Sequence, residues 1–216
     1  MARFKLYGYW RSAATYRVRI ALALKGFTWD ETAVDLMVGE QFANDISERN
    51  PQNTVPILYD GDTAITQSLA ILEYLEERYP ERPLLPRDPL KRAAVRSFAL
   101  ISIADSHPLQ TPRVRKWLSS QMGLDDAAVL QWVQHWFQEG FSAMEAYLTA
   151  RSGHSKFCFG EFPSIADIAL AAHSEGAAFA KVSREKYPLI SAVVANCQKL
   201  DAFSQNGPRA LSPASE

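Results

Sequence analysis

The 216-residue chain has few cysteines, almost no charge imbalance and no long apolar run. Its two cysteines, Cys158 and Cys197, cannot build a disulfide framework and form no Cys-x-x-Cys pair, so a reduced, cytoplasmic setting fits best. The 23 basic and 24 acidic residues leave a formal net charge of −1, which argues against a basic nucleic-acid-binding face. No apolar run approaches the ~20 residues of a membrane-spanning helix. We therefore expect neither nucleic acid nor membrane as a partner.

Metal-ligand spacing and a secretory signal are missing too. The four histidines are scattered, and no His or Cys cluster has the spacing of a metal site. Residues 1–5 contain no apolar stretch with a small-residue cleavage site. Hydrophobic residues make up 47% of the chain, which is ample for a buried core.

The first eighty residues change their hydrophobic period several times. The pattern predicts a strand at 4–7, a helix from Ser12 to a Lys25-Gly26 C-cap, a second strand within 27–34 and a weak helix at 41–47. A hairpin with an Asp60-Gly61 turn follows at 55–65, and then a helix at 67–79. The order β-α-β-α-β-β-α predicts a small α/β layer with parallel and antiparallel strands.

Four prolines then fall within ten residues, which indicates a linker at 81–89 between a domain at 1–80 and one at 90–216. The second domain reads as all-helical, with helices expected at 88–103 (bending near Pro108 and Pro112), 125–149, 164–181 and 189–203. Ser164 and Asp167 fit a capping box that serves folding. The last dozen residues read as a frayed, disordered tail.

Several motifs, in the right order, resemble zeta-class glutathione transferases. They are Tyr9 to Leu22, Asn50 to Pro56, Gln67 to Ile71, Leu84 to Pro86, His107 to Gln110 and Phe159 to Asp167. The resemblance covers residues 4 to about 203. It implies an α/β thioredoxin-like N-terminal domain, an all-α C-terminal domain, glutathione as cofactor and a homodimer. The family includes maleylacetoacetate and maleylpyruvate isomerases.

Ser12 stands at the start of the first helix and aligns with the catalytic serine of that family. A helix N-terminus carries roughly half a positive charge and free N–H groups, which favour a bound thiolate. The plainer interpretation, an N-cap, is compatible with that role. Many relatives read Ser-Ser-Cys here, whereas this chain reads Ser12-Ala13-Ala14. Thr15 is then a candidate second hydroxyl donor; the alternative is a solvent-facing residue of the first turn.

The resemblance also implies a glutathione site built from short polar motifs. Gln67 and Ser68 open a helix and would hold the γ-glutamyl carboxylate; the alternative is a simple cap. A cis Val55-Pro56 bond would leave the Val55 backbone to pair with glutathione like an added strand. Gln52 and His107 match positions near glutathione, although a histidine such as His107 is more often simply packed or at the surface.

Arginines would decide the substrate, because a guanidinium binds a carboxylate through two parallel hydrogen bonds. Arg11 and Arg113 match family positions, and a solvated surface arginine is the alternative for each. A third arginine, common in isomerases, is replaced: the run reads Ala177-Ala178-Phe179-Ala180. Phe179 favours a more apolar electrophile, and Lys181 lies about half a turn away from that face.

The leading hypothesis is a glutathione-dependent cis–trans isomerase of a maleyl dicarboxylate. One alternative is a general glutathione transferase or dehalogenase that acts on an apolar electrophile. A second alternative is a non-catalytic glutathione-binding module, for which Ala13 and Ala14 would mark an eroded site.

Overall fold

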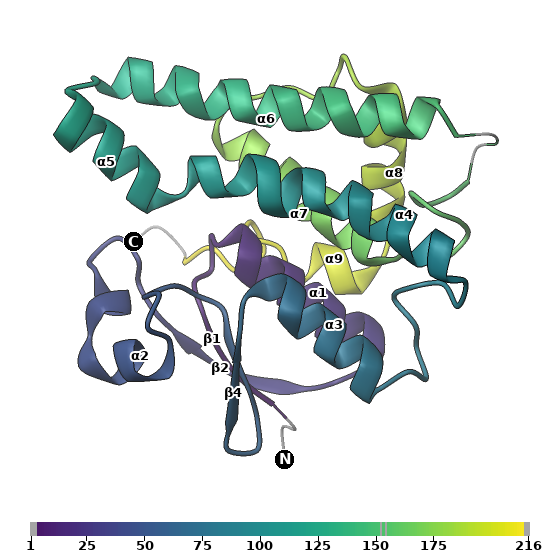
Figure 1. Ribbon diagram of the computed structural model, residues 1–216, viewed down its shortest axis with the longest axis horizontal. Helices are drawn as coiled ribbons and strands as arrows, with labels where there is room; N and C mark the ends of the chain where they lie inside the picture. The colour runs from purple at the N-terminus through teal and green to yellow at the C-terminus, as the bar shows by residue number, and fades with distance from the viewer. Residues whose placement is uncertain (1–3, 152, 154, 214–216) are drawn as a thin grey trace. The chain divides into compact units, whose positions relative to one another are not determined.

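The computed structural model describes residues 4–151, 153 and 155–213 (Figure 1). The chain folds as two compact units. The first unit runs to Leu84 and resumes at Leu200, and the second is Leu85–Lys199. The boundary therefore falls inside the expected linker, where both leucines are buried.

The first unit contains a four-stranded sheet in the order β2-β1-β3-β4. Its strands are β1 (Phe4–Gly8), β2 (Trp29–Ala33), β3 (Ile57–Asp60) and β4 (Thr63–Thr66). β1 pairs parallel with β2, and the other two pairs are antiparallel. The predicted hairpin is confirmed, with Gly61 at φ 61° in the turn between β3 and β4, a conformation that glycine adopts without steric cost.

The two faces of this sheet are covered by different elements. Leu6 and Leu58 are opposite each other and fully buried, while the neighbouring pair Tyr7 and Ile57 points to the other face. Helices α1 (Ala13–Lys25) and α3 (Ser68–Arg78) lie side by side across the sheet (Figure 1). Ile57 joins a cluster that includes Ile46 of helix α2 (Asn44–Arg49).

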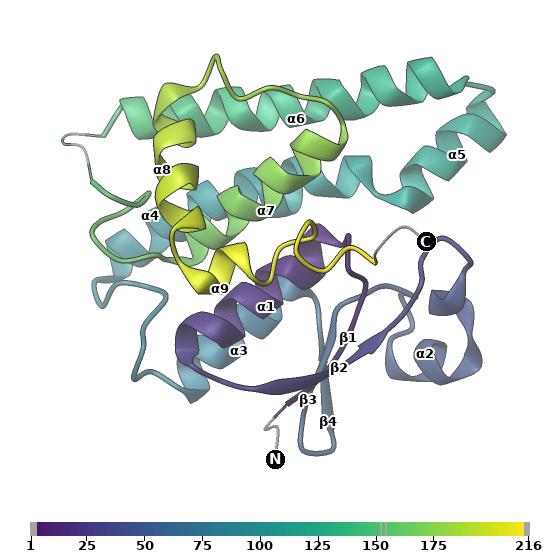
Figure 2. The same cartoon turned by 180° about the vertical axis from the view of Figure 1, so that it is seen from behind.

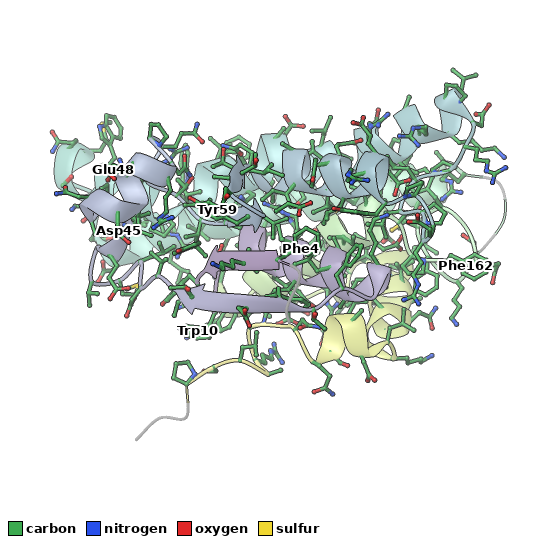
Figure 3. The ribbon with its side chains drawn as sticks, turned by 90° about the horizontal axis from the view of Figure 1, so that it is seen from below. Phe4, Trp10, Asp45, Glu48, Tyr59 and Phe162 are labelled. Carbon is green, nitrogen blue, oxygen red and sulfur yellow. The ribbon has the colours of Figure 1, made fainter. Side chains whose placement is uncertain are left out.

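Helix α2 is short and amphipathic. It follows a 3₁₀ turn, η1 (Glu40–Phe42), and buries Ile46 while Asp45 and Glu48 stay at the surface (Figure 3). The weak helical pattern predicted at 41–47 is thus confirmed as two short pieces.

The C-terminal segment differs from the prediction. Helix α9 (Asp201–Ser204) belongs to the first unit and lies against α1 (Figure 2). Phe203 is fully buried, and its carbonyl accepts a hydrogen bond of 2.9 Å from the Tyr16 hydroxyl. The expectation that this tail frays within the second domain is wrong up to Pro208, because Gly207 and Pro208 are buried and Tyr16 of α1 lies next to Gly207. Residues 214–216 lie outside the described residues.

The second unit is helical, as predicted, but its helices are interrupted more often. It contains α4 (Pro89–Leu100), the π-helical η2 (Ile101–Ser106), the 3₁₀ turn η3 (His107–Gln110), α5 (Pro112–Met122), α6 (Asp126–Thr149), α7 (Ile165–Phe179) and α8 (Pro188–Gln198). The sequence did not predict α5, which begins at Pro112 as an N1 proline. The helix expected at 189–203 ends at Gln198.

Helix α7 forms the core of this unit, and most of its residues are buried. Its start is the predicted capping box: Asp167 accepts hydrogen bonds from the Ser164 backbone and hydroxyl, both at 2.8 Å. Asp167 also accepts one of 2.7 Å from the Cys158 backbone N–H. Burial is the main reason that the pKa of this carboxyl lies above its ordinary value.

Among the described residues, no helix is both long and apolar enough to cross a membrane. Within the same ranges, no group of three His, Cys, Asp or Glu side chains is placed to hold a metal ion. Cys158 and Cys197 are both buried and free of disulfides, and burial raises the pKa of each thiol.

Candidate active site

Ser12 is the N-cap of α1. Its Oγ accepts a hydrogen bond of 3.2 Å from the Thr15 N–H, and its own N–H donates to the Tyr9 carbonyl at 3.0 Å. No described residue accepts the Ser12 hydroxyl hydrogen. The side chain is half-buried. The cap and a donor role therefore coexist geometrically: the oxygen stabilises the helix, and the hydrogen remains available to a ligand.

Thr15 lies on the inner side of the first turn. It is fully buried, and its Oγ1 accepts a hydrogen bond of 3.4 Å from the Tyr9 N–H. Its methyl group lies against Gly8, where an added Cβ would come within 2.4 Å. The solvent-facing alternative is wrong, and the same burial argues against Thr15 as a second donor to a ligand.

The N-terminus of α3 is held in an unusual backbone conformation. Gln67 has φ 67° and precedes the first helical residue, Ser68. A positive φ is uncommon for a side chain larger than glycine, and such residues gather at functional sites. Gln67 is exposed and donates through Nε2 to Oε1 of Gln52, so the structure brings these two predicted residues together.

Val55 offers an open stretch of backbone. The Val55-Pro56 peptide bond is cis, as the resemblance implied. Neither the N–H nor the carbonyl of Val55 has a hydrogen-bond partner in the described part of the chain. The side chain is buried in the cluster with Ile46 and Ile57. Val55 thus presents main-chain groups just before β3 begins.

Arg17 is a buried cation next to the candidate residue Ser68, and the sequence did not single it out. It lies on α1, is 2% exposed, and donates from Nε to the Ser68 Oγ at 3.1 Å. Burial lowers its pKa to about 10. Its only sequence signal is an arginine within a partly apolar helix, and arginines are mostly exposed.

The second unit holds the predicted residues His107 and Arg113. His107 is half-buried and opens η3, directly after the π-helical turn, a geometry that is frequent at functional sites. Arg113 is exposed in the first turn of α5.

A chain of hydrogen bonds fixes the segment that carries these two side chains. The buried Gln110 donates to Ser106 Oγ at 2.7 Å, and Ser106 donates to the Trp136 carbonyl at 2.7 Å. Trp132 donates to the Leu109 carbonyl at 2.7 Å, and its ring meets Trp136 edge-on at 5.7 Å. These contacts anchor residues 106–110 to α6.

The remaining predicted substrate residues are Arg11 in the first unit and Phe179 in the second. Arg11 is exposed beside Ser12, and Phe179 is half-buried as the last residue of α7. Lys181 is exposed and has φ 59°, so it lies beyond the helix rather than within its last turn as expected.

Comparisons with known proteins agree with this geometry. Residues 6–83 match the family model described as glutathione S-transferase, N-terminal domain. A maleylpyruvate isomerase of Ralstonia sp. is 41% identical over 206 residues, which are 95% of this chain and 97% of that protein.

Two solved structures are similar over almost the whole chain. One is the holo structure of a maleylpyruvate isomerase described as a bacterial zeta-class glutathione transferase, with TM-score 0.94, 40% identity, and 98% of this chain and 100% of that one covered. The other is a maleylacetoacetate isomerase of Methylobacterium extorquens AM1 with bound malonate and glutathione, with TM-score 0.94, 40% identity, and 98% and 99% covered. The chain belongs to the zeta class of glutathione transferases.

Proposed function

We propose that this protein is a glutathione-dependent cis–trans isomerase of a maleyl dicarboxylate, of the maleylpyruvate or maleylacetoacetate type. The observation that carries the proposal is the Ser12 hydroxyl, set at the N-terminus of α1 with its hydrogen available. The comparisons support the substrate class. Similar proteins bear these isomerase names, and one of them binds malonate, a dicarboxylate, together with glutathione.

The residues of the first unit fit glutathione. The free N–H groups of the first α3 turn and the Ser68 hydroxyl suit the γ-glutamyl carboxylate. The unpaired Val55 N–H and carbonyl suit the backbone of the cysteinyl residue, in the manner of an added strand. Gln52 and Gln67 lie beside the carboxylate site, and we assign His107 of the second unit a glutathione contact as well.

Bound glutathione supplies a thiolate that adds to the substrate double bond and leaves after the bond has rotated, so glutathione is neither consumed nor oxidised. Ser12 donates its hydroxyl hydrogen to that sulfur, and the α1 N-terminus adds partial positive charge. Both favour the ionised thiol, whose ordinary pKa is ~8.5. We assign Thr15 a structural role: its hydroxyl accepts from the Tyr9 N–H and so fixes the backbone that contacts Ser12.

Arg11 and Arg113 are the proposed carboxylate ligands. Both are exposed, so their guanidinium groups are accessible to a substrate. An arginine that holds the carboxylate also stabilises negative charge that develops on the neighbouring atoms during addition.

A second candidate function is a general glutathione transferase or dehalogenase for apolar electrophiles. The observation in its favour is Phe179, which ends α7 where isomerases commonly have an arginine. A product screen separates the two. An isomerase converts a maleyl substrate to its trans isomer at constant glutathione, whereas a transferase accumulates an adduct or halide. Tight glutathione binding with neither product would support the non-catalytic module instead.

We also propose that the protein acts as a homodimer in the cytoplasm. The support is the family resemblance and the two buried cysteines, which remain free thiols. Sedimentation equilibrium measures the assembly directly, and a monomer at micromolar concentration would contradict the dimer.

A further inference from the structure

Arg17 is a buried cation whose donors are mostly unused. Only 2% of the residue is exposed, and its one hydrogen bond to a described residue runs from Nε to the Ser68 hydroxyl at 3.1 Å. The Nη1 atom is buried without a partner. No carboxylate of the described residues pairs with this guanidinium. A buried charge without a counter-charge is unfavourable, so Arg17 calls for an explanation.

Helix α1 carries two other buried cations, and each of them pairs with a carboxylate. Arg19 is also 2% exposed, but it forms a two-pronged ion pair with Glu31. Lys25 is 6% exposed and binds Glu76 at 3.1 Å. Arg17 lacks such a carboxylate, although burial lowers its pKa only to about 10 and it stays charged at neutral pH. The missing partner of Arg17 is therefore an anion that the described residues do not supply.

The position of Arg17 indicates that this anion binds at the N-terminus of α3. Ser68 is the first residue of α3, an 11-residue helix whose first-turn N–H groups have no helical acceptor. Because Ser68 Oγ accepts from Arg17, its own hydrogen is left to donate away from Arg17. An anion at this helix end meets the amides and the hydroxyl in front, with the guanidinium behind.

We propose that Arg17 is the buried counter-charge of the γ-glutamyl carboxylate of glutathione, a positioning residue that acts through the Ser68 hydroxyl. This inference rests on the proposed function, since it takes glutathione as the ligand of the α3 N-terminus. It adds a residue from α1 to that site and makes the site selective for a carboxylate over a neutral group of the same size.

The test compares two ligands by isothermal titration calorimetry: glutathione, and 4-aminobutanoyl-cysteinylglycine, which lacks only the γ-glutamyl α-carboxylate. Arg17→Met removes the charge but keeps an unbranched apolar chain. We expect it to weaken glutathione about tenfold, since hydrogen bonds to charged groups have effects of at least that order. Affinity for the analogue should not change. Arg17→Lys, which keeps the charge, should fall between Met and wild type.

The ratio of the two affinities is the decisive quantity, because it does not depend on how much of a variant is folded. Arg19→Met is the matched control, a buried arginine on the same helix that should reduce stability and leave the ratio unchanged. An unchanged ratio in Arg17→Met would overturn the inference, whether both affinities fall together or neither does. A failure of the proposed isomerase activity gives a different result. Wild-type protein would then show the expected ratio of affinities for glutathione and the analogue but form no trans isomer. Wild-type protein that binds neither ligand would overturn both.

Discussion

The two units hold their candidate site residues in contrasting ways. In the first unit the groups suited to glutathione are a helix cap with a local hydrogen bond, a helix N-terminus whose Ser68 accepts from Arg17, and an open stretch of backbone before a cis proline. In the second unit His107 and Arg113 follow a π-helical turn and a 3₁₀ turn, and Arg113 is exposed. A site made of backbone and caps survives many side-chain changes. A site made of exposed side chains can change its substrate with single replacements, and we propose that position 179 is one such place.

The largest expected effect tests the chemistry of the first unit. Ser12→Ala should lower kcat by about 100-fold to 1,000-fold, as loss of one preorganised donor does elsewhere, with little change in glutathione affinity. It should also cost about 1 kcal/mol of stability through the lost cap. Steady-state kinetics and calorimetry measure both.

The matched control is Asp125→Ala. Asp125 caps α6 by accepting from the Ala128 N–H at 2.8 Å, so it should cost similar stability while kcat stays at the wild-type value. Wild-type turnover in Ser12→Ala would show that Ser12 is a cap alone and that the first unit does not supply the chemistry.

The next effect concerns stability in the second unit. Asp167→Ala leaves three donors, from Ser164 and Cys158, without their acceptor in a buried place. We expect a loss of about 3 kcal/mol in the free energy of unfolding, measured by urea denaturation. Glutathione affinity of the folded variant should stay constant. A weakened affinity would mean that the capping box of Asp167 contributes to glutathione binding as well as to folding.

Asp167 also predicts a pH dependence. Because burial raises the pKa of its carboxyl above the unfolded value, its contribution to stability is full below the unfolded pKa and declines as pH rises through the raised one. Asp167→Asn should remove that decline from urea denaturation curves recorded across the acid range. The same decline in wild type and variant would assign it to another group.

A smaller effect tests the exposed side chains of the second unit. Arg113→Ala should raise KM for a maleyl dicarboxylate about tenfold, at the low end for a lost charged hydrogen bond because the residue is exposed. Lys116→Ala, another exposed cation on α5, is the control and should leave KM unchanged. Equal KM values for both variants would remove Arg113 from the substrate site.

The smallest expected effect tests whether one replacement at position 179 changes the substrate specificity. Phe179→Arg returns a cation to the end of α7 and should lower KM for the dicarboxylate by roughly twofold to fivefold, the range of an exposed ion pair. The rate with an apolar electrophile should fall in parallel. If both substrates respond in the same direction, position 179 does not select between them.

Much of the first unit could be predicted from the sequence because its signals are local. The alternation of β1, the Asp60-Gly61 turn and the Gly26 C-cap each specify their own geometry. Ser12 was predicted for the same reason, since a cap depends on the residues next to it.

What could not be predicted depends on contacts between distant segments. Burial of Thr15 and of Arg17 follows from how α1 meets β1 and α3, and periodicity does not reveal that. The tail was misjudged because Phe203 finds its partner Tyr16 almost the whole chain away. The π-helical turn at 101–106 has no sequence signature, and it ends the α-helix expected at 88–103 at Leu100.

The central claim is that the first unit makes glutathione a nucleophile through Ser12. The most direct measurement is a pH titration of the ultraviolet absorbance of the bound thiolate, in wild type and in Ser12→Ala. We predict a thiol pKa well below that of free glutathione in wild type and a higher pKa in the variant. An unshifted pKa in wild type, or the same pKa in both proteins, would contradict the account.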